Sequence, residues 1–499
     1  MIKVYVDWNV ISGMKAGHFK ELEQTFISNR QKFLLPYSTS HIGDIFASYS
    51  EDSEQRKIID EDLAFITHLT GNLCLANDSK AVNLGYWDPR ELIDDRIREA
   101  EMFTDFSIDK LFSSFQDDPL MASIGNMYKA LIAAIPIEEG LKQAYEDPKS
   151  AEALNKLFPG LQDDLTMDGF FKSFGKMYMN LNETEGYKDL REIVQQVGVN
   201  SGHFNEHKNP FDVIGQAYEK KGMENLNPEQ YFKNSNNAPA WFDEICNEYI
   251  KLDMHGYKAD KVKVTEKEKN TFRNTTEDAF HTAFATRCDF YITNDDKNYR
   301  KSKAVYEKLG VFTRVLKPDE FLKYYNDYLN VHDFGEHWKT IRAAHDVNKL
   351  EPLNYQDGEM FGWVSYPEYF FFDFFNKLMI PIPSEDNALM ILAREHPANS
   401  YVMGYEEYKK LVSYFVQELG PDLDGQTEFD PTEIQDGYWK GREWKTNIGL
   451  FRLLQNNGWC QLYIFKEEEP VVKQFSKPWF KAKWISLRSK ISSLNLFKK

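Results

Sequence analysis

The hydrophobic pattern at the start of the chain alternates between strands and helices. Residues 1–6 (MIKVYV) alternate in polarity and are rich in β-branched side chains, which predicts a strand. Residues 33–36 and 72–76 are short apolar runs that predict further strands, while the segments 19–26 and 51–72 have helical spacing. Because strands that alternate with helices favour a parallel sheet, we expect an α/β fold.

A second helix-and-strand pattern occurs far along the chain. Thr275 with Asp278 three residues later matches a capping box, which predicts that a helix begins at Thr275. Residues 290–292 (FYI) predict a buried strand, and the polar residues 293–296 (TNDD) follow at its end. The pattern therefore predicts one acid, Asp278, in the first turn of a helix and another, Asp295, at the tip of a strand.

Two aspartates lie at the ends of predicted strands that are distant in sequence. Asp7 directly follows the first strand, and Asp295 follows the strand at 290–292. In a parallel sheet the carboxyl ends of the strands share one edge, where ligands are commonly bound. We therefore expect Asp7 and Asp295 to lie close together, with Asp278 on the helix that precedes the second of these strands.

The rest of the chain is predicted to add further parts to this α/β core. Residues 88–238 have helical periodicity and few β-branched runs, which predicts an α-helical insertion. Beyond residue 330 the pattern mixes both element types, with a helix predicted at 446–454 and a strand at 460–465. The predicted organisation is a core of residues 1–87 and 239–330, the insertion at 88–238, a mixed α+β domain at 331–470, and a tail helix at 471–499.

The C-terminal segment, residues 471–499, contains eight Lys and Arg residues and no acid. Its apolar residues recur at spacings of four and three, which predicts a basic amphipathic helix. These apolar residues are Phe480, Trp484, Leu487, Ile491 and Leu494. A helix of this kind can lie on a membrane, dock on a partner, contact nucleic acid or pack against its own domain. The pattern leaves these alternatives open, and membrane contact is not the favoured one.

The composition is that of a large globular protein. The chain has 499 residues, 42% of them hydrophobic, which is enough for two or three domains. Its four cysteines are scattered without a C-x-x-C pair, and a strand rather than a signal peptide stands at the N-terminus, so we expect a cytoplasmic protein. The net charge of −18 argues against a large nucleic-acid-binding surface. It does not argue against catalysis on one phosphodiester, because carboxylates can recruit divalent cations.

The predicted cluster of acids has a direct chemical consequence. Carboxylates that lie together repel one another, and a protein tolerates them by binding cations or by raising a pKa. Mg²⁺ and Mn²⁺ prefer oxygen ligands, and no cluster of His and Cys in the sequence favours zinc. We therefore predict that Asp7, Asp278 and Asp295 bind Mg²⁺ or Mn²⁺.

The order of these residues resembles the PIN-domain nuclease family. The family pattern has an aspartate that closes the first strand, an acid on an early helix, a helix of the type Asp-x-x-His-x-x-x-Ala, and a Thr-x-Asp loop. The corresponding segments here are Asp7 with Asn9, then Asp44, then residues 278–285 (DAFHTAFA), then residues 293–295 (TND). The resemblance covers residues 1–75 and 240–330, and Asp44 stands where the family pattern has a glutamate.

The resemblance implies a PIN-like three-layer domain and an endoribonuclease that hydrolyses phosphodiesters by metal-activated water. The catalytic residues it implies are Asp7, Asp44, Asp278 and Asp295, and the substrate-positioning residues are Asn9, Thr293 and Asn294. RNA is then expected as the substrate ahead of DNA. A regulatory protein partner or a homo-oligomer fits a chain of this length, and a part in bacterial stress response or antiviral defence fits by analogy.

Each of these residues also has a structural interpretation. Asp278 and Asp295 can each cap a helix, and Asp7 can end its strand in an Asx-turn. His41 and His281 belong to a residue type that is more often structural than catalytic. The alternative function is therefore a catalytically inactive PIN-fold scaffold that binds a protein or RNA partner.

Overall fold

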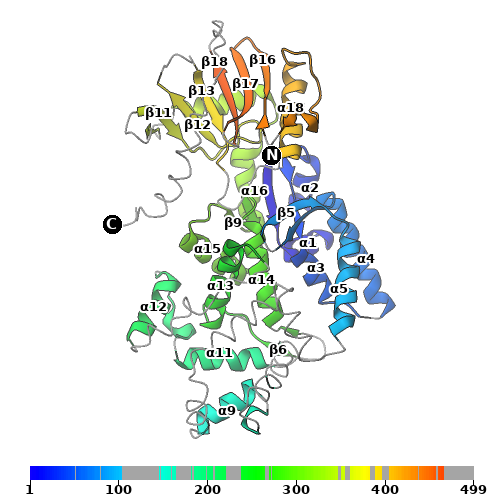
Figure 1. Cartoon of the computed structure of the whole chain (residues 1–499), viewed down its shortest axis with the longest axis vertical. Coiled ribbons are helices and arrows are strands. Elements are labelled where there is room, and N and C mark those ends of the chain that lie inside the picture. The colour runs from blue at the N-terminus through cyan, green and yellow to red at the C-terminus, as the bar shows by residue number, and fades with distance from the viewer. Residues whose placement is uncertain are drawn as a thin grey trace. The chain divides into compact units, whose positions relative to one another are not determined.

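Strand β1 (Ile2–Val6) forms where the alternating N-terminal residues predict it, and it is buried along its whole length. In the computed structural model β1 pairs in parallel with β8 (Phe290–Ile292), with Val6 opposite Ile292. Strand β8 in turn pairs in parallel with β9 (Arg314–Leu316). The predicted α/β fold with a parallel sheet is confirmed, with helices beside the sheet (Figure 1). Val6 at the end of β1 lies opposite Ile292 at the end of β8.

The chain divides into two compact units. Unit 1 comprises residues 1–2, 28–34 and 319–499, and unit 2 comprises residues 3–27 and 35–318. The structure describes residues 1–50, 52–78, 80–103, 145, 148–158, 160–163, 173, 181, 185–197, 199–205, 208–220, 238–264, 269–270, 272–346, 350–354, 360–382, 388–395, 404–435, 438–456 and 459–465. The predicted tail helix lies outside these residues, and so does much of the predicted insertion.

In the described part of the first 320 residues, the strands form two sheets and one short hairpin. The main sheet has the order β2-β1-β8-β9, where β2 is Phe33–Leu34. A smaller sheet has the order β3-β4-β5, and its strands are β3 (Tyr37–Ser38), β4 (Leu73–Asn77) and β5 (Val82–Tyr86). The strand predicted at 72–76 is therefore present as β4, but it belongs to this separate sheet. The hairpin is β6 (Lys263–Val264) with β7 (Lys269–Asn270).

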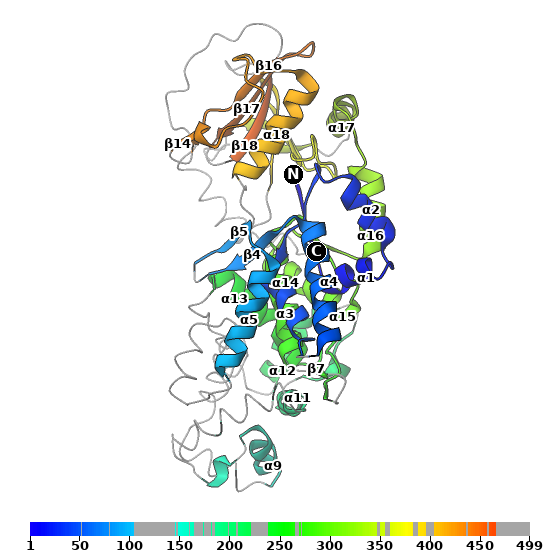
Figure 2. The ribbon, with the colours of Figure 1, turned by 90° about the vertical axis from the view of Figure 1, so that its right-hand side faces the viewer.

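Eleven α-helices lie in the described part of residues 3–318. They are α1 (Trp8–Lys15), α2 (Lys20–Ser28), α3 (Thr39–Phe46), α4 (Ser53–Thr70), α5 (Pro89–Phe103), α9 (Pro148–Leu157), α11 (Gly186–Val197), α12 (Pro210–Lys220), α13 (Ala240–Met254), α14 (Phe272–Ala285) and α15 (Asp296–Leu309). Helix α14 contacts β8 and packs against both α13 and α3. Helices α3, α4 and α5 lie side by side (Figure 2). Helix α14 thus brings its side chains to the early helix α3.

Helix α14 begins earlier than the capping box predicts. It starts at Phe272, so Thr275 lies inside the helix and the predicted start is wrong. The buried Phe272 ring packs edge-to-face on Tyr187, with 5.0 Å between ring centroids, which anchors the additional turn in the core. Asp278 therefore lies in the middle of the helix and not in its first turn.

Helix α15 begins directly after the strand tip that carries the predicted acids. Asp295 is its N-cap, and the side chain accepts hydrogen bonds from the backbone N–H groups of Lys297 and Asn298, both at 2.7 Å. The helix ends at Gly310, whose φ of 66° lies in the left-handed region that glycine adopts most readily. One carboxylate at the sheet edge thus has a clear structural role.

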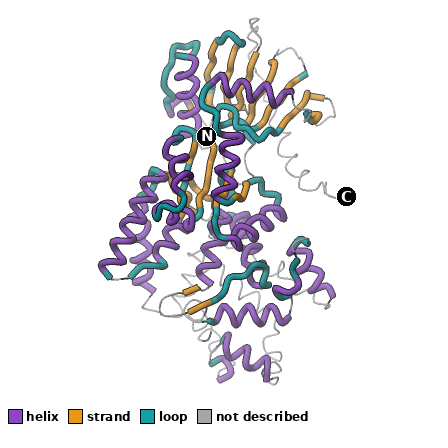
Figure 3. The backbone as a smooth tube through the Cα atoms, turned by 180° about the vertical axis from the view of Figure 1, so that it is seen from behind, coloured by secondary structure: helices purple, strands orange, loops and turns teal. Residues whose placement is uncertain are grey.

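Unit 1 is built on a seven-stranded antiparallel sheet (Figure 3). The sheet order is β10 (Glu351–Asn354), β11 (Met360–Ser365), β12 (Lys377–Pro381), β13 (Ala388–Ala393), β18 (Trp459–Phe465), β17 (Leu450–Asn456) and β16 (Arg442–Lys445). The remaining elements are α16 (Pro318–Tyr324), α17 (Phe334–Asp346), α18 (Gly404–Leu419), β14 (Ile434–Gln435) and β15 (Tyr438–Trp439). This mixture of α and β agrees with the prediction for this part of the chain.

The helix predicted at 446–454 is wrong. Residues 450–456 form β17, which pairs with β18 along its whole length. Phe451 and Leu453 are both fully buried in one core cluster, so the apolar residues here follow the two-residue period of a strand. Among the helices in the described ranges, none is both long enough and apolar enough to cross a bilayer.

Candidate metal centre

Asp7 lies at the end of β1, and donors from several elements hold its side chain. It precedes α1 but makes no side-chain cap to that helix. Instead, Oδ2 accepts hydrogen bonds from Thr293 Oγ1 (2.6 Å), Asn9 Nδ2 (2.7 Å), Asn298 Nδ2 (3.1 Å) and the Tyr291 hydroxyl (3.3 Å). The carboxyl group is 3% exposed and fixed in orientation, as the carboxylate of a metal ligand usually is.

Asp44 and His281 meet at the contact between α3 and α14. His281 Nε2 lies 2.8 Å from Asp44 Oδ2, and the Asp44 side chain is 26% exposed. Burial alone would lower the pKa of His281, but the adjacent Asp44 carboxylate raises it to about 9. One ligand atom each from Asp7, Asp44 and His281 lies within 4.8 Å of the other two. These three residues are called the Asp/His group below.

The other ring nitrogen of His281 is held by a buried polar cluster. His281 Nδ1 lies 2.6 Å from the Tyr5 hydroxyl, which is also 2.6 Å from Ser38 Oγ. Ser38 caps α3, and His41 of the same capping box has Nε2 2.8 Å from the carbonyl oxygen of Val6. The sequence prediction missed Tyr5 and Ser38. A usable signal exists for Tyr5, because it lies two residues before Asp7 and thus on the same face of the strand.

Asp278 lies beside the Asp/His group without belonging to it. Its side chain is partly buried, and burial raises its pKa well above its usual range. The carboxylates of Asp7 and Asp44 raise it further, while the Lys301 ammonium opposes them. Burial also raises the pKa of Asp7, with contributions from Asp44 and Asp295. The predicted acids therefore share one electrostatic environment.

The loop after β8 brings the remaining predicted residues to the same edge. The Asn294 backbone N–H donates to Asn9 Oδ1 at 3.0 Å, and the Asp295 N–H donates to Thr293 Oγ1 at 3.3 Å. Thr293 is buried and bonded to Asp7, whereas Asn9, Asn294 and Asp295 are exposed. Thr293 thus links the Asp7 carboxyl to the Asp295 backbone, and the Asp295 side chain is engaged as the α15 cap.

A buried ion-pair network lies on the far side of Asp278. Lys301 Nζ is 3.0 Å from Asp253 and 3.2 Å from Asp260, and both Lys301 and Asp253 are fully buried. Arg191 binds the other oxygen of Asp253 at 3.0 Å. Sequence reasoning missed this network, because its members come from separate helices and carry no local motif.

Glu277 is a buried acid that the sequence prediction did not single out. The residue is 3% exposed, and its carboxyl group lies so close to Gly43 that a Cβ at that position would overlap it. Neither carboxyl oxygen has a hydrogen-bond partner within the described residues, and the nearest cation, Arg96, is 3.9 Å away. Burial raises the pKa of Glu277, and the Asp44 charge raises it further.

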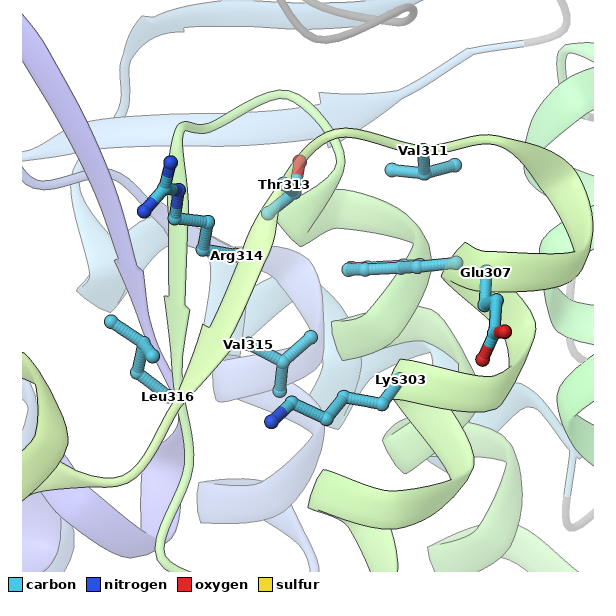
Figure 4. A pocket seen from close by; sticks show the side chains of 8 residues that line it. Lys303, Glu307, Val311, Thr313, Arg314, Val315 and Leu316 are labelled. Atoms are coloured by element: carbon cyan, nitrogen blue, oxygen red, sulfur yellow. The ribbon is translucent and has the colours of Figure 1, made fainter. Parts of the chain in front are cut away.

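A shallow hollow of about 390 Å³ lies elsewhere in unit 2, between α15 and β9 (Figure 4). Lys303, Tyr306 and Glu307 line it from the helix, and Val311 with residues 313–316 line it from the strand side. None of the predicted site residues contributes to this hollow. The Asp/His group is therefore the place where the described structure gathers chemically reactive side chains.

Two carboxylates and an imidazole at this spacing are suited to hold a divalent cation. The site lies at the carboxyl ends of parallel strands, where α/β folds commonly bind ligands. Comparison with known proteins finds no family model, no curated protein and no solved structure that matches this chain.

Proposed function

We propose that this chain is a metal-dependent nuclease that hydrolyses phosphodiesters, with a fold similar to that of PIN-domain nucleases. The observation that carries the proposal is the Asp/His group, whose ligand atoms lie within 4.8 Å of one another at the edge of a parallel sheet. The Asp295 carboxylate adds to the negative potential at Asp7, and the Asp278 carboxyl group lies in the same electrostatic environment. A site with this much carboxylate charge is suited to a cation and, through it, to a phosphate.

The donor set fits a divalent cation, with Asp7, Asp44 and His281 as the residues that would hold it. When bound, such a cation supplies Lewis acidity toward a phosphoryl oxygen and lowers the pKa of water. Asp7 is pre-oriented by four donors, so it would meet the cation without a change of rotamer. Asn294 is exposed at the same edge, where its side-chain amide can donate to the substrate, while the Asn9 amide donates to Asp7 and Thr293 and would act by positioning them.

The substrate and context of the proposal come from the resemblance to PIN-domain nucleases. RNA is the proposed substrate ahead of DNA, and Mg²⁺ or Mn²⁺ is the cation that the resemblance implies. A role in stress response or antiviral defence and control by a protein partner belong to the proposal on the same ground. A cytoplasmic location fits the four cysteines, which are buried and form no disulfide.

Cleavage assays with purified full-length chain test the proposal. We expect single-stranded RNA to be cut when Mg²⁺ or Mn²⁺ is present and to remain intact with EDTA. Asp7→Asn should lower kcat by about 10²-fold or more, because the pre-oriented carboxylate is lost. Cleavage that survives unchanged in Asp7→Asn would assign the activity to another site or to a contaminant and overturn the proposal.

A non-catalytic scaffold is the second candidate function. It is favoured by the ion pair between Asp44 and His281, because this pair neutralises part of the site charge without a metal. The buried Lys301 does the same beside Asp278. A scaffold predicts no cleavage of RNA or DNA with any cation and no cation bound in crystals soaked with Mn²⁺.

A further inference from the structure

The two ring nitrogens of His281 have different partners, and this fixes which nitrogen faces the site. Nδ1 lies 2.6 Å from the Tyr5 hydroxyl inside the core, while Nε2 lies 2.8 Å from Asp44 Oδ2. Histidines that bind metals are usually held by a hydrogen bond at the second ring nitrogen, which sets the tautomer and the ring orientation. A cation that replaces the Nε2 proton would meet the Nε2 lone pair beside Asp44, while Nδ1–H stays donated to the Tyr5 hydroxyl.

We propose that the Asp/His group binds a first-row transition cation, such as Fe²⁺, Co²⁺ or Zn²⁺, with His281 Nε2 as a direct ligand. This inference rests on the proposed function, because it names the cation of the same site. Mg²⁺ takes oxygen ligands almost exclusively, whereas imidazole nitrogen suits the later first-row ions. A site that contained aspartates alone would not make this distinction.

Glu277 provides an independent sign that a cation belongs beside Asp44. It precedes His281 by one helical turn, so both side chains leave α14 toward α3. Its carboxyl group lies against Gly43, next to Asp44, and neither oxygen is hydrogen-bonded in the described part of the chain. A buried carboxyl group without a hydrogen bond, and with Arg96 no nearer than 3.9 Å, is costly for the folded state. A cation held by Asp44 reduces that cost by stabilising the charged form of Glu277.

The direct test is pulsed electron paramagnetic resonance on the metal-free full-length chain, loaded with Mn²⁺ as the spectroscopic probe. A nitrogen coupling from a directly bound imidazole is expected in the wild type. It should change when histidine is labelled with ¹⁵N and disappear in His281→Asn. A merely structural histidine in contact with Asp44 would give no such coupling.

Calorimetric titration of the same protein with Co²⁺ and with Mg²⁺ measures the preference. We expect the Kd for Mg²⁺ divided by the Kd for Co²⁺ to fall by at least about tenfold in His281→Asn. Removing even a residue that only hydrogen-bonds to a metal ligand lowers metal affinity by about 10-fold or more. His255→Gln is the matched control, because His255 is equally buried in the same unit but bonds to Tyr218 and the Lys251 carbonyl. The control should leave the ratio unchanged.

The outcomes separate this inference from the proposed function. Cation binding with nitrogen coupling but without any nucleic-acid cleavage would support the inference and overturn the nuclease proposal. Cleavage with an unchanged Kd ratio in His281→Asn, or a wild type without nitrogen coupling, would overturn the inference and leave an oxygen-bound cation. Should His281→Asn fail to fold, the wild-type coupling decides alone. No cation binding at all would overturn both and leave an Asp44–His281 ion pair.

Discussion

At the residue scale, Lys301 determines how the negative charge around Asp278 is balanced. Its ammonium group is fully buried between Asp253 and Asp260 and lies 4.6 Å from the centroid of the Tyr249 ring. Burial alone would raise the pKa of Asp253, but Lys301 and Arg191 hold it below its usual value. Removing any one charge of this network therefore leaves a buried charge without one of its counter-charges, which destabilises the folded state.

Asp253→Ala is expected to destabilise the protein strongly. Removing one member of a buried ion pair leaves Lys301 charged and without its fully buried partner, which typically costs about 3–5 kcal/mol. The control Asp260→Ala should cost less, because the Asp260 side chain is 35% exposed and water can replace it. Urea unfolding of both variants measures the difference. An equal loss of unfolding free energy in the two variants would show that the burial of Asp253 does not determine the cost.

The sequence predicts some residues of the site and not others. Asp7 and Asp295 could be predicted to meet, because parallel strands end at one edge whatever the rest of the fold does. His281 could not be chosen over Asp278 in the same way. The two lie three residues apart on α14, and the rotation of that helix against α3 decides which one reaches Asp44. That rotation depends on packing, including the additional turn that starts at Phe272.

At the element scale, Asp295 follows β8 and is the N-cap of helix α15. The side chain accepts two backbone N–H bonds at the helix start, so its role as a cap can be separated from a role in catalysis. Asp295→Asn should keep the helix stable, because Asn caps as well as Asp, whereas Asp295→Ala should lose about 1 kcal/mol. Thermal unfolding of the two variants measures the cap.

The same pair of variants tests the chemistry at this position. If the Asp295 charge contributes to the proposed reaction, Asp295→Asn loses activity while its unfolding free energy stays at the wild-type value. An Asp295→Asn variant with full cleavage activity, beside a destabilised Asp295→Ala, would assign Asp295 to capping alone. Activity and stability are therefore measured on the same preparations.

The contact between α3 and α14 gives a second prediction at the element scale. Replacing a glycine inside a helix with alanine usually stabilises the folded protein by about 1 kcal/mol. Gly43→Ala should instead destabilise by about 1–3 kcal/mol, because the new methyl group would overlap the buried Glu277 carboxyl. Gly215→Ala in α12 is the control, since a Cβ there meets nothing within 4 Å and the usual gain is expected.

A double-mutant cycle measures whether Glu277 is the cause. Gly43→Ala combined with Glu277→Ala should recover most of the loss, because the overlapping group has been removed. Additive effects of the two substitutions would contradict the contact. This contact could not be predicted from the sequence, since Gly43 and Glu277 are more than two hundred positions apart and neither belongs to a motif.

At the scale of the whole molecule, the local sequence pattern predicts where a helix or strand lies better than it predicts which of the two forms. The strand at 290–292 and the strand at 1–6 follow directly from short apolar runs with β-branched residues. The segment 446–454 was assigned to the wrong type, because a run with apolar residues at close spacing fits either period until its partner strand is known. Non-local pairing with β18 decides that case.

The acid stability of the whole chain provides the last prediction, because each unit contains a buried histidine that folding keeps neutral. Burial lowers the pKa of His255 in unit 2 to about 4 and that of His337 in unit 1 to about 3, against about 6.5 in an unfolded chain. The unfolded state therefore binds more protons than the folded state below pH 6.5 or so. The contribution of these two histidines to stability should be complete above about pH 6.5 and fall as the pH decreases toward the two lowered pKa values. The raised pKa of His281 acts in the opposite sense, because its contribution is complete below about pH 6.5 and is lost as the pH rises toward 9.

The depressed pKa of Asp253 acts in the same direction as His255 and His337 but only at lower pH, below about 3.9, where its carboxylate is protonated in the unfolded chain. The contribution of His255 alone amounts to about 3 kcal/mol by pH 4, at about 1.4 kcal/mol for each pKa unit. Urea unfolding of the wild type at pH 7, 5.5 and 4.5 measures the decrease, and His255→Gln should make it shallower because one of the two protons is no longer taken up. An identical pH dependence in His255→Gln would show that His255 titrates normally in the folded protein.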